Sequence, residues 1–425
     1  MQNKTLVLPQ TQTVILRLDL KTLRRDHSLR IFHLREESGA LAVAEGESKQ
    51  YDMTEGASGI YSVRRHLFYF NAATQIFHGV TENYRYRNVL SEPMKMTYAV
   101  TKEGKERRFC VTPSNIYWLS GGTTFTNGVG RGGSCACIHA ERMFTANGYR
   151  LNYTAPLNFE DWLDKRRLSG YFEFPTDGGE ILAMQSYKEK LYLFRRRGIT
   201  QVRLLGEELN AKSTVLPYGW GDLVPDSVAP CGDKICFFTE RGFYSFNGGV
   251  ASAVADGCVG EIDLTERVKA VSAYGKYYAL VTVKSGKKSL FCFEPETQSG
   301  HFILNGAEDV TAGDDFWFKR GLGIYRLTQR GLPAVGECRL EADNLAFHLG
   351  DERFVDAVAV EGEGEFEVCL RSSRGERRAS GAAQTVLKFR SPLRGNGYSV
   401  TVKPKNAEAR LVALCLRVRE ENNGN

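Results

Sequence analysis

The chain has 425 residues, of which 42% are hydrophobic and 25% are charged, and its formal net charge is +6. This length exceeds one small core and favours two or three units, unless a closed repeat array absorbs most of the chain. The mild charge is spread over interleaved acidic and basic residues, so contact with polyanions is not required. No run reaches the roughly 18 apolar residues of a membrane span, and the first residues hold no long apolar segment, so we expect a soluble protein without a membrane partner.

The first 50 residues predict strands at 13–20 and 28–34, separated by a charged stretch at 21–26. One interpretation is an N-terminal hairpin or a strand that closes a repeat array. The other is an arm that contacts a neighbouring subunit. We favour the first interpretation.

From about residue 51, short hydrophobic runs recur, each after a polar turn. They lie at 65–71, 115–120, 141–147, 190–194, 234–238, 276–281 and 315–319. Second strands follow several of them and open at Gly148, Gly198, Gly242 and Gly323, which suits turns with a positive backbone dihedral. The runs at 115 and 141 are too close for a whole four-stranded blade between them, so two runs could share a blade.

The stretch 190–199 aligns with 234–243 at an offset of 44 residues, and both copies keep an Arg-Gly turn. A hairpin that recurs at such a spacing, without a helical pattern between copies, is typical of propeller blades. The sequence therefore predicts an all-β fold with a six- or seven-bladed β-propeller.

After residue 331 the pattern changes to strict two-residue alternation. Three sets of residues share one face of a strand: Phe366, Val368 and Leu370; Tyr398, Val400 and Val402; and Val412, Leu414, Leu416 and Val418. Half-buried antiparallel strands of this kind predict a small C-terminal β-sandwich. We divide the chain into N-terminal strands or arm (1–50), propeller (51–335) and sandwich with a disordered end (336–425).

Ten cysteines are scattered through the chain, most of them in apolar runs where a thiol behaves as a small hydrophobe. This favours folding in a reducing cytoplasm without a disulfide framework. Cys135 and Cys137 point the same way on a strand, with His139 beyond them, but a second cysteine pair for zinc is missing. We therefore predict no metal and no cofactor.

Hydrolysis of glycosides needs two carboxylates that face each other across the sugar. The candidates in this sequence are Asp314 and Asp315, Glu160 and Asp161, and Asp343. Neighbouring acids on a strand or turn splay apart, so solvated turn acids are the better interpretation. No catalytic residue is predicted.

The basic run Arg195, Arg196 and Arg197 is the candidate contact for DNA or a protein partner, because such residues can follow a phosphate backbone. The pairs at 64–65, 107–108 and 166–167 are weaker candidates of the same kind. The alternative is that these charges protect hairpin edges from unwanted pairing, and we favour that alternative.

Residues 139–256 resemble a known family. The sequence segments that carry the resemblance are, in chain order, 139–156, 158–162, 178–184, 191–199 and 228–248. They are similar to the β-propeller tail-hub and packaged-DNA stabilisation proteins of tailed bacteriophages, which cap the head-to-tail channel below the portal and adaptor rings. The resemblance covers about a third of the chain, and residues 1–50 depart from it.

The resemblance implies a structural, non-enzymatic virion protein of the tail or neck, assembled in the host cytoplasm as several copies in a ring. Its partners would be other head-to-tail connector or tail proteins, and any DNA contact would be non-specific. A cytoplasmic propeller that acts as a binding module or as a carbohydrate-active enzyme is the alternative, because the fold hosts many functions.

Overall fold

The computed structural model describes residues 12–19, 23, 29–32, 34–37, 40–43, 46–87, 89, 91–126, 130–162, 169–202, 214–215, 221–328, 338–346 and 353–420. Its named elements are β-strands and two short 3-10 helices, η2 (Thr176–Gly178) and η3 (Val259–Glu261). The prediction of an all-β chain is confirmed. Within the described residues, no helix has the length and apolar character needed to cross a bilayer.

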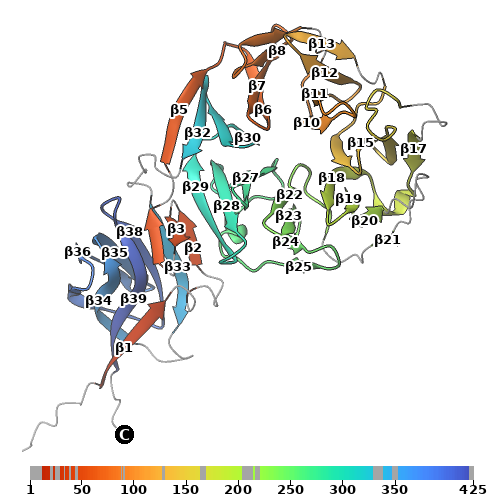
Figure 1. The fold of residues 1–425 in the computed structure, drawn as a ribbon. Coiled ribbons are helices and arrows are strands. Elements are labelled where there is room, and N and C mark those ends of the chain that lie inside the picture. The colour runs from red at the N-terminus through yellow and green to blue at the C-terminus, as the bar shows by residue number, and fades with distance from the viewer. Residues whose placement is uncertain are drawn as a thin grey trace, which may run out of the picture.

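Seven groups of four antiparallel strands stand around a ring (Figure 1). The first four are β6 (Ala57–Val63), β7 (His66–Asn71), β8 (Ile76–Gly79), β9 (Tyr84–Tyr86); β10 (Lys95–Val100), β11 (Glu106–Val111), β12 (Ile116–Ser120), β13 (Thr123–Thr126); β14 (Cys135–His139), β15 (Arg142–Asn147), β16 (Arg150–Tyr153), β17 (Gly170–Glu173); and β18 (Ile181–Tyr187), β19 (Lys190–Arg195), β20 (Gly198–Val202), β21 (Thr214–Val215). The next two are β22 (Ala229–Cys231), β23 (Lys234–Thr239), β24 (Gly242–Phe246), β25 (Ala251–Ala253); and β26 (Lys269–Ala273), β27 (Lys276–Thr282), β28 (Lys288–Glu294), β29 (Ser299–Asn305). The arrangement is propeller-like.

The last group combines strands from opposite parts of the chain. β30 (Asp309–Ala312), β31 (Phe316–Arg320) and β32 (Gly323–Thr328) are completed by β5 (Gly46–Asp52), which pairs antiparallel with β32. Because the next strand after β5 is β6, this pairing joins the last group to the first. A closed ring leaves no open sheet at its ends to recruit another chain.

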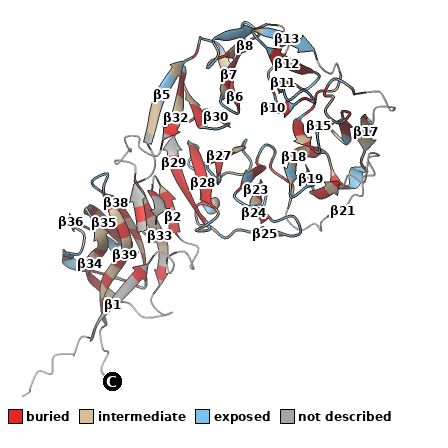
Figure 2. Cartoon of the chain, viewed as in Figure 1, coloured by how far each residue is buried: buried red, intermediate tan, exposed pale blue. Residues whose placement is uncertain are grey.

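A separate apolar cluster fills the space between each pair of neighbouring groups, and Figure 2 shows the buried positions on strands all around the ring. At the junction of the last and first groups, for example, Trp317 and Ile324 pack with Ile60 and Leu67. Aromatic side chains dominate several clusters, such as Phe238 and Phe243 with ring centroids 4.7 Å apart. Strands this short cannot bury their apolar side chains alone, so the packing between neighbouring groups removes these side chains from water.

The predicted hydrophobic runs are all strands, and six of the seven form the second strand of a group. The 44-residue repeat corresponds to β19 and β23, which occupy equivalent places in adjacent groups. The run at 115–120 differs because it is the third strand, β12, and it does not share a group with β15. The second strand there, β11, begins with Glu106, Arg107 and Arg108, so its sequence has no long apolar run.

The remaining strands form one further sheet and the extension of the sheet that begins with β26 to β29, and the two enclose one core. Their bounds are β1 (Gln12–Asp19), β2 (Leu29–Phe32), β3 (Leu34–Glu37), β4 (Ala40–Val43), β33 (Arg339–Ala346), β34 (Arg353–Glu363), β35 (Glu365–Ser372), β36 (Gly375–Ala382), β37 (Val386–Gly395), β38 (Gly397–Pro404) and β39 (Arg410–Glu420). One sheet has the order β3-β4-β39-β34-β37, with β1 also on β39. In the other, β2-β33-β38-β35-β36 continues from β29.

The predicted inward faces of these strands are confirmed, with one exception. Phe366, Val368 and Leu370 are buried, as are Tyr398, Val400 and Val402. In the last strand, Leu414, Leu416 and Val418 are buried, but Val412 is only half-buried. The register between β34 and β39 shifts there, so Val412 falls in a bulge that interrupts the alternation.

The first 50 residues serve both parts of the molecule. β1 to β4 pair with C-terminal strands or with each other, β2 also pairs with β29 of the ring, and β5 closes the ring. The charged stretch 21–26 lies outside the described residues except for residue 23, as does the predicted domain boundary between residues 335 and 336. The end of the chain, 421–425, also lies outside them.

A small set of contacts joins the C-terminal sheets to the ring. Phe32 of β2 stacks on Phe302 of β29 at 5.4 Å, and the guanidinium of Arg339 lies 3.8 Å from the Phe32 ring centroid. Arg30 donates to Glu261 at 2.8 Å and to Asp343 at 2.6 Å, which links η3 of the ring to β33. The junction therefore combines an aromatic stack with a bridging arginine.

Gly313 is expected to be essential for the closed ring. A β-carbon at this position would lie 2.0 Å from the Arg64 carbonyl oxygen, in the turn where the Asp314 amide donates to that oxygen at 2.9 Å. Gly313→Ala should lower the free energy of unfolding by about 1–3 kcal/mol, measured by denaturant unfolding. Gly260→Ala is the matched control, because its β-carbon meets no atom within 4 Å, and it should change stability by less than about 0.5 kcal/mol. Equal effects of the two substitutions would contradict the close approach.

Asp356 is expected to make the C-terminal sheets sensitive to acid. Its carboxylate accepts from Arg417 at 2.6 and 3.0 Å and pairs with Arg419 at 2.5 Å. Burial alone would raise the pKa of Asp356, but the hydrogen bonds and charges of Arg417 and Arg419 outweigh it and lower the pKa. The carboxylate therefore stabilises the fold above its ordinary pKa, and this stabilisation is lost as pH falls through the lowered folded pKa.

Asp356→Asn should accordingly cost about 1–3 kcal/mol at neutral pH and flatten the loss of stability between about pH 4 and pH 2. Chemical unfolding at a series of pH values measures both effects. A variant with the same acid dependence as the unsubstituted chain would show that Asp356 does not carry it.

Candidate functional site

A cavity with a volume of about 540 Å³ lies on the axis of the ring. It is lined by residues on or next to the first strand of each of the seven groups, from β6 through β30. Because the walls come from every group, closure of the ring creates the cavity. Its volume is in the range of about 300–1,000 Å³ that is common for small-molecule sites.

Small hydroxyl side chains join the walls where the ring closes. The Ser62 amide donates to Thr311 Oγ1 at 2.8 Å, and the two hydroxyls lie 3.0 Å apart. The contact connects β6 and β30, which are separated by 249 residues in sequence. Side-chain hydroxyls here satisfy a backbone donor that has no sheet partner across the gap between groups.

The strongest charge pair of the cavity joins β26 to β30. Lys269 Nζ lies 2.6 Å from Asp309 Oδ1, and the other oxygen of Asp309 accepts from the Ile60 amide at 2.8 Å. Asp309 is therefore held by a cation and by the backbone of the neighbouring group. The Lys269 ammonium also lies 5.4 Å from the Tyr61 ring centroid.

Tyr61 and Glu92 form a second polar contact on the wall. The Tyr61 hydroxyl donates to Glu92 Oε1 at 2.9 Å. Burial, followed by the negative charge of Glu92, raises the pKa of Tyr61 far above its usual range. The phenol is therefore a permanent hydrogen-bond donor at neutral pH and not a general base.

The other two carboxylates of the cavity are also paired. Glu308 accepts from Lys319 at 2.8 Å, and Asp226 lies 3.4 Å from Arg267. The hydrogen bond from Lys319 lowers the pKa of Glu308. A general acid in glycoside hydrolysis needs a raised pKa, so Glu308 is tuned in the opposite direction.

Lys95 and Cys135 line another part of the wall, and Cys137 belongs to the same strand as Cys135. The half-buried Lys95 lies close enough to Cys135 and Cys137 to act on both thiols electrostatically. Burial nevertheless raises the pKa of Cys137, and it raises the pKa of Cys135 to about 12. Both sulfurs are therefore neutral thiols at physiological pH, which does not favour a nucleophilic role.

The predicted common face of Cys135 and Cys137 is confirmed, since both belong to one apolar cluster. His139 Nδ1 lies 2.8 Å from the Ser186 hydroxyl, and burial lowers the pKa of the imidazole. In the part of the chain that the structure describes, the group that could hold a metal is a different one: Cys292, Glu294 and His301, whose ligand atoms lie within 4.8 Å of one another.

The charge of this second group is balanced by Lys276, so a metal ion is not needed to explain it. Its ammonium lies 2.8 Å from Glu294 Oε1, and the pair is largely removed from solvent. A buried carboxylate with a cation at hydrogen-bond distance is already compensated. We therefore interpret the group as a structural ion pair of adjacent strands.

The three arginines of the predicted contact run have different environments. Arg195 is buried, and its guanidinium donates to the carbonyls of Gly179 and Pro175. Arg196 and Arg197 occupy the turn between β19 and β20, and they pair with Glu180 at 3.2 Å and with Asp222 at 3.5 Å. Arg195 thus holds a turn in place, whereas contact of Arg196 and Arg197 with DNA or a partner stays a prediction.

The remaining sequence candidates lie away from the cavity wall. Glu160 pairs with Arg107, Asp315 with Arg326, and Asp343 with Arg30. The pairs at 64–65 and 107–108 include Arg64 and Arg107, which stack on Tyr98 and Trp118. Residues 166–167 lie outside the described part of the chain.

Sequence reasoning missed the charged residues of the cavity. Lys269 and Asp309 each begin the first strand of a group, and these strands have no long apolar run to mark them. Lys269 and Asp309 each lie a few residues before a hydrophobic second strand, and this regular spacing could have identified them from the sequence.

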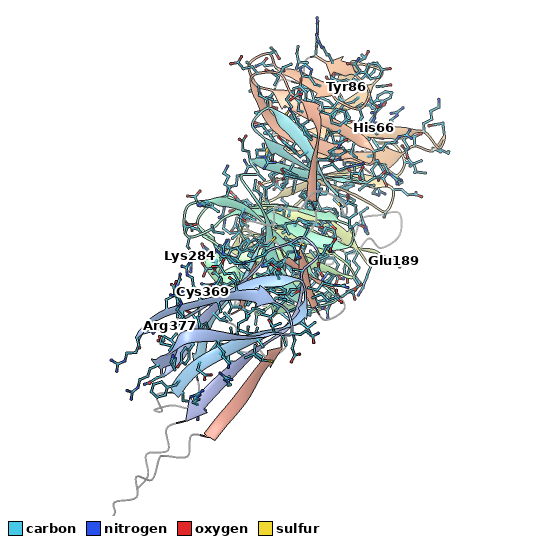
Figure 3. All side chains as sticks on the ribbon, turned by 90° about the vertical axis from the view of Figure 1, so that its left-hand side faces the viewer. His66, Tyr86, Glu189, Lys284, Cys369 and Arg377 are labelled. Atoms are coloured by element: carbon cyan, nitrogen blue, oxygen red, sulfur yellow. The ribbon has the colours of Figure 1, made fainter. Side chains whose placement is uncertain are left out.

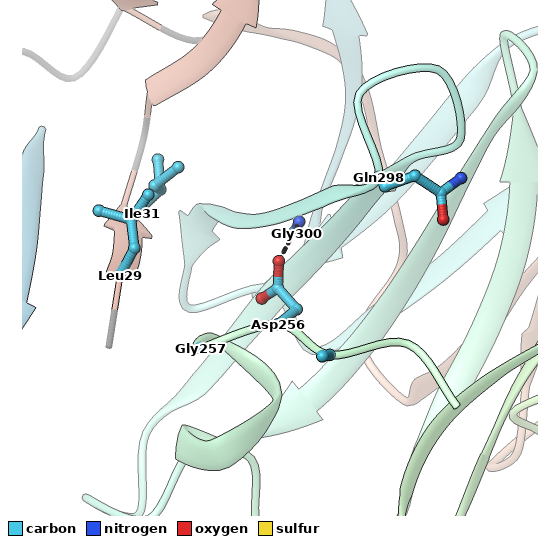
Figure 4. Close-up of a pocket in the computed structure, with 7 residues that line it drawn as sticks. Leu29, Ile31, Asp256, Gly257, Gln298 and Gly300 are labelled. Carbon is cyan, nitrogen blue, oxygen red and sulfur yellow. Dashed lines mark hydrogen bonds between the residues drawn. The ribbon is translucent and has the colours of Figure 1, made fainter. Parts of the chain in front are cut away.

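A second, much smaller pocket lies at the junction with β2 and has a volume of about 20 Å³, enough for one water molecule. Figure 4 shows Asp256 accepting from the Gly300 amide there, at 2.6 Å, beside Leu29 and Ile31. The pocket is too small for an organic ligand, so the axial cavity is the candidate site.

Comparison with known proteins gives no relative in sequence: no protein-family description matches the chain, and no curated protein matches it. Solved structures with a similar course of the chain include virginiamycin B lyase from Staphylococcus aureus, with 12% identity and a TM-score of 0.46 over 66% of this chain and 99% of that one. The extracellular domain of a protein described as a hybrid two-component system from B. thetaiotaomicron has 9% identity and a TM-score of 0.49, and the match covers 91% of this chain and 62% of that one. At these scores neither likeness assigns a function.

Lys269 is expected to stabilise the fold by neutralising Asp309 in the cavity wall. Lys269→Met would leave Asp309 without its cation in a site where only 14% of the Asp309 side chain is exposed. We expect a loss of about 2–3 kcal/mol in the free energy of unfolding, less than for a fully buried pair. Adding Asp309→Asn should restore part of the loss, because the uncompensated charge is then removed.

Arg267→Gln is the control for this experiment. Its side chain is 78% exposed and lies 3.4 Å from Asp226, so its removal should cost less than about 1 kcal/mol. A Lys269→Met variant as stable as Arg267→Gln would mean that Asp309 does not depend on the ammonium.

Proposed function

We propose that the chain is a structural virion protein of a tailed phage, a seven-bladed β-propeller with a C-terminal β-sandwich in the tail or the head-to-tail connector. It would bridge assembly partners around the DNA channel, as several copies in a ring. Each of the seven four-stranded groups would be one blade.

The observation that carries this proposal is where the fold places the sequence segments that resemble the phage family. The stretches 139–156, 178–184, 191–199 and 228–248 fall on three consecutive groups, β14 to β17, β18 to β21 and β22 to β25. The resemblance thus follows a continuous arc of the ring and not scattered loops. This continuity supports common architecture with tail-hub and connector proteins.

The charge pairs of the cavity also support a structural role. Each of its four carboxylates has a hydrogen-bond or ion-pair partner on the chain itself. Three of these pairs join neighbouring groups, whereas Glu308 and Lys319 belong to one group. Contacts between groups fix their distance, which suits a rigid scaffold. Identical copies that meet head to tail would close into a ring when the rotation between them allows it.

The alternative is a cytoplasmic propeller that binds a small ligand or acts on carbohydrate. The cavity volume and its carboxylates favour this alternative. Its catalytic form would need one acid to be released from its partner and to have a raised pKa. Glu308, whose pKa is lowered by Lys319, would have to be retuned by the substrate.

Localisation in purified particles tests the proposed function. Electron microscopy of particles from an infected host should show the chain as a ring of fixed copy number at the neck or tail. Particles that lack it, together with a chain found only as a free monomer in extracts, would contradict the proposal. Hydrolysis of an oligosaccharide by the purified chain, abolished by Glu308→Gln, would instead establish the alternative.

A further inference from the structure

The C-terminal sheets carry a dense group of positive charges at the end of β35, in the turn that follows it, and on β36 and β37. We name it the basic edge, and it consists of Arg371, Arg374, Arg377, Arg378, Lys388, Arg390 and Arg394. Between residues 371 and 394 the only carboxylate is Glu376, so this segment has a net charge of +6. That equals the net charge of the whole chain, so the remaining residues sum to zero.

The two strands of the basic edge lie side by side although they belong to different sheets. β36 ends one sheet and β37 ends the other. Arg377 bridges them, because its Nε donates to the Ser391 carbonyl at 3.1 Å, and the Ser372 hydroxyl donates to the Arg394 carbonyl at 2.7 Å. Figure 3 shows Arg377 at the outer side of the C-terminal sheets.

The basic edge contains seven cationic residues and one carboxylate, and Glu367 of β35 lies 3.9 Å from Arg378. Glu376 accepts from Arg371 at 2.6 Å and from Arg378 at 2.5 Å, and these two arginines lower the pKa of Glu376 to about 2. Lys388 and Arg390 are exposed, and no described carboxylate forms an ion pair with either. Like charges on neighbouring strands repel each other, so a bound polyanion would relieve the repulsion.

The surface between these charges is polar and lacks exposed aromatic groups. The exposed positions include Ser373, Ser380, Gln384 and Ser391, whereas Phe389 is buried. Val386 is the one large hydrophobic residue of this segment that is strongly exposed, at 60%. Protein interfaces usually have an apolar or aromatic centre, whereas phosphate backbones are contacted by Arg, Lys, Ser and Gln.

The lack of exposed aromatic side chains also makes the basic edge a poorer binding surface for single-stranded nucleic acid than for a duplex. Binding of single-stranded nucleic acid relies on bases that stack on exposed aromatic side chains, and the basic edge offers none within residues 371–394. Arginine forks match phosphate oxygens in pairs. We propose that the basic edge binds duplex nucleic acid through its phosphate backbone, without reading the base sequence.

This inference does not depend on the proposed virion role and differs from the predicted contact at Arg195, Arg196 and Arg197. Protection of sheet edges by charge is the competing explanation. One or two charges suffice for such protection, whereas the basic edge has five cationic residues on two adjacent strands and two more directly before them.

Fluorescence anisotropy with the full chain and a labelled DNA duplex of about 20 base pairs tests the inference. Binding at about 50 mM salt should weaken steeply as salt rises, and two unrelated sequences should bind equally. The double variant Lys388→Gln with Arg390→Gln should bind at least about tenfold more weakly at low salt, and the slope of log K against log salt should fall by about 2.

Lys284→Gln with Lys287→Gln is the matched control, because it removes the same charge from exposed positions on the ring. It should leave duplex binding unchanged, and thermal unfolding should confirm that both variants fold. The proposal is overturned by no duplex binding at low salt, by equal loss in the control, by tighter binding of a single strand, or by displacement with polyglutamate as readily as with DNA. The last result would indicate an acidic protein partner. Ring formation in particles is a separate measurement, so failure here leaves the virion proposal standing.

Discussion

Pairing of β5 with β32 is the constraint on which the rest of the molecule depends. It completes the last group of the ring with residues 46–52 and delivers the chain directly into β6. With this pairing, every group has a neighbour on both sides and every apolar cluster is enclosed. Without it, β32 would expose a free edge and the cluster around Trp317 and Ile60 would be open to water.

The axial cavity follows from the same closure. Lys269 and Asp309 belong to adjacent groups, as do Ser62 and Thr311, so their contacts exist only when the groups stand at the right spacing. The polar wall is therefore part of the structural support of the ring. The requirement for this spacing explains why Lys269 and Asp309 neutralise each other across two groups.

Much of the fold could be predicted because local patterns decide it. The apolar run at 190–194 and its copy at 234–238 form equivalent strands, and the alternation at Phe366, Val368 and Leu370 gives the buried face directly. Long-range pairings could not be predicted. Nothing local in residues 12–19 indicates that they pair with residues 413–420, and the bulge at Val412 depends on that neighbouring strand. The candidate site was hidden for the same reason, because its residues are brought together by seven separate groups. The burial of Arg195 was hidden as well, because the carbonyls that hold it belong to another turn.

The threading of the N-terminal strands has a consequence for biosynthesis. Thr13 pairs with Arg419, and Ser48 pairs with Arg326, so β1 and β5 find their partners only after about 400 and about 280 further residues have been made. Until then the unpaired strands must remain accessible, at the elongation rate of about 5–20 residues per second. The middle groups can assemble during translation, but the ring can close only after β32 has emerged, and β1 can pair only after β39 has.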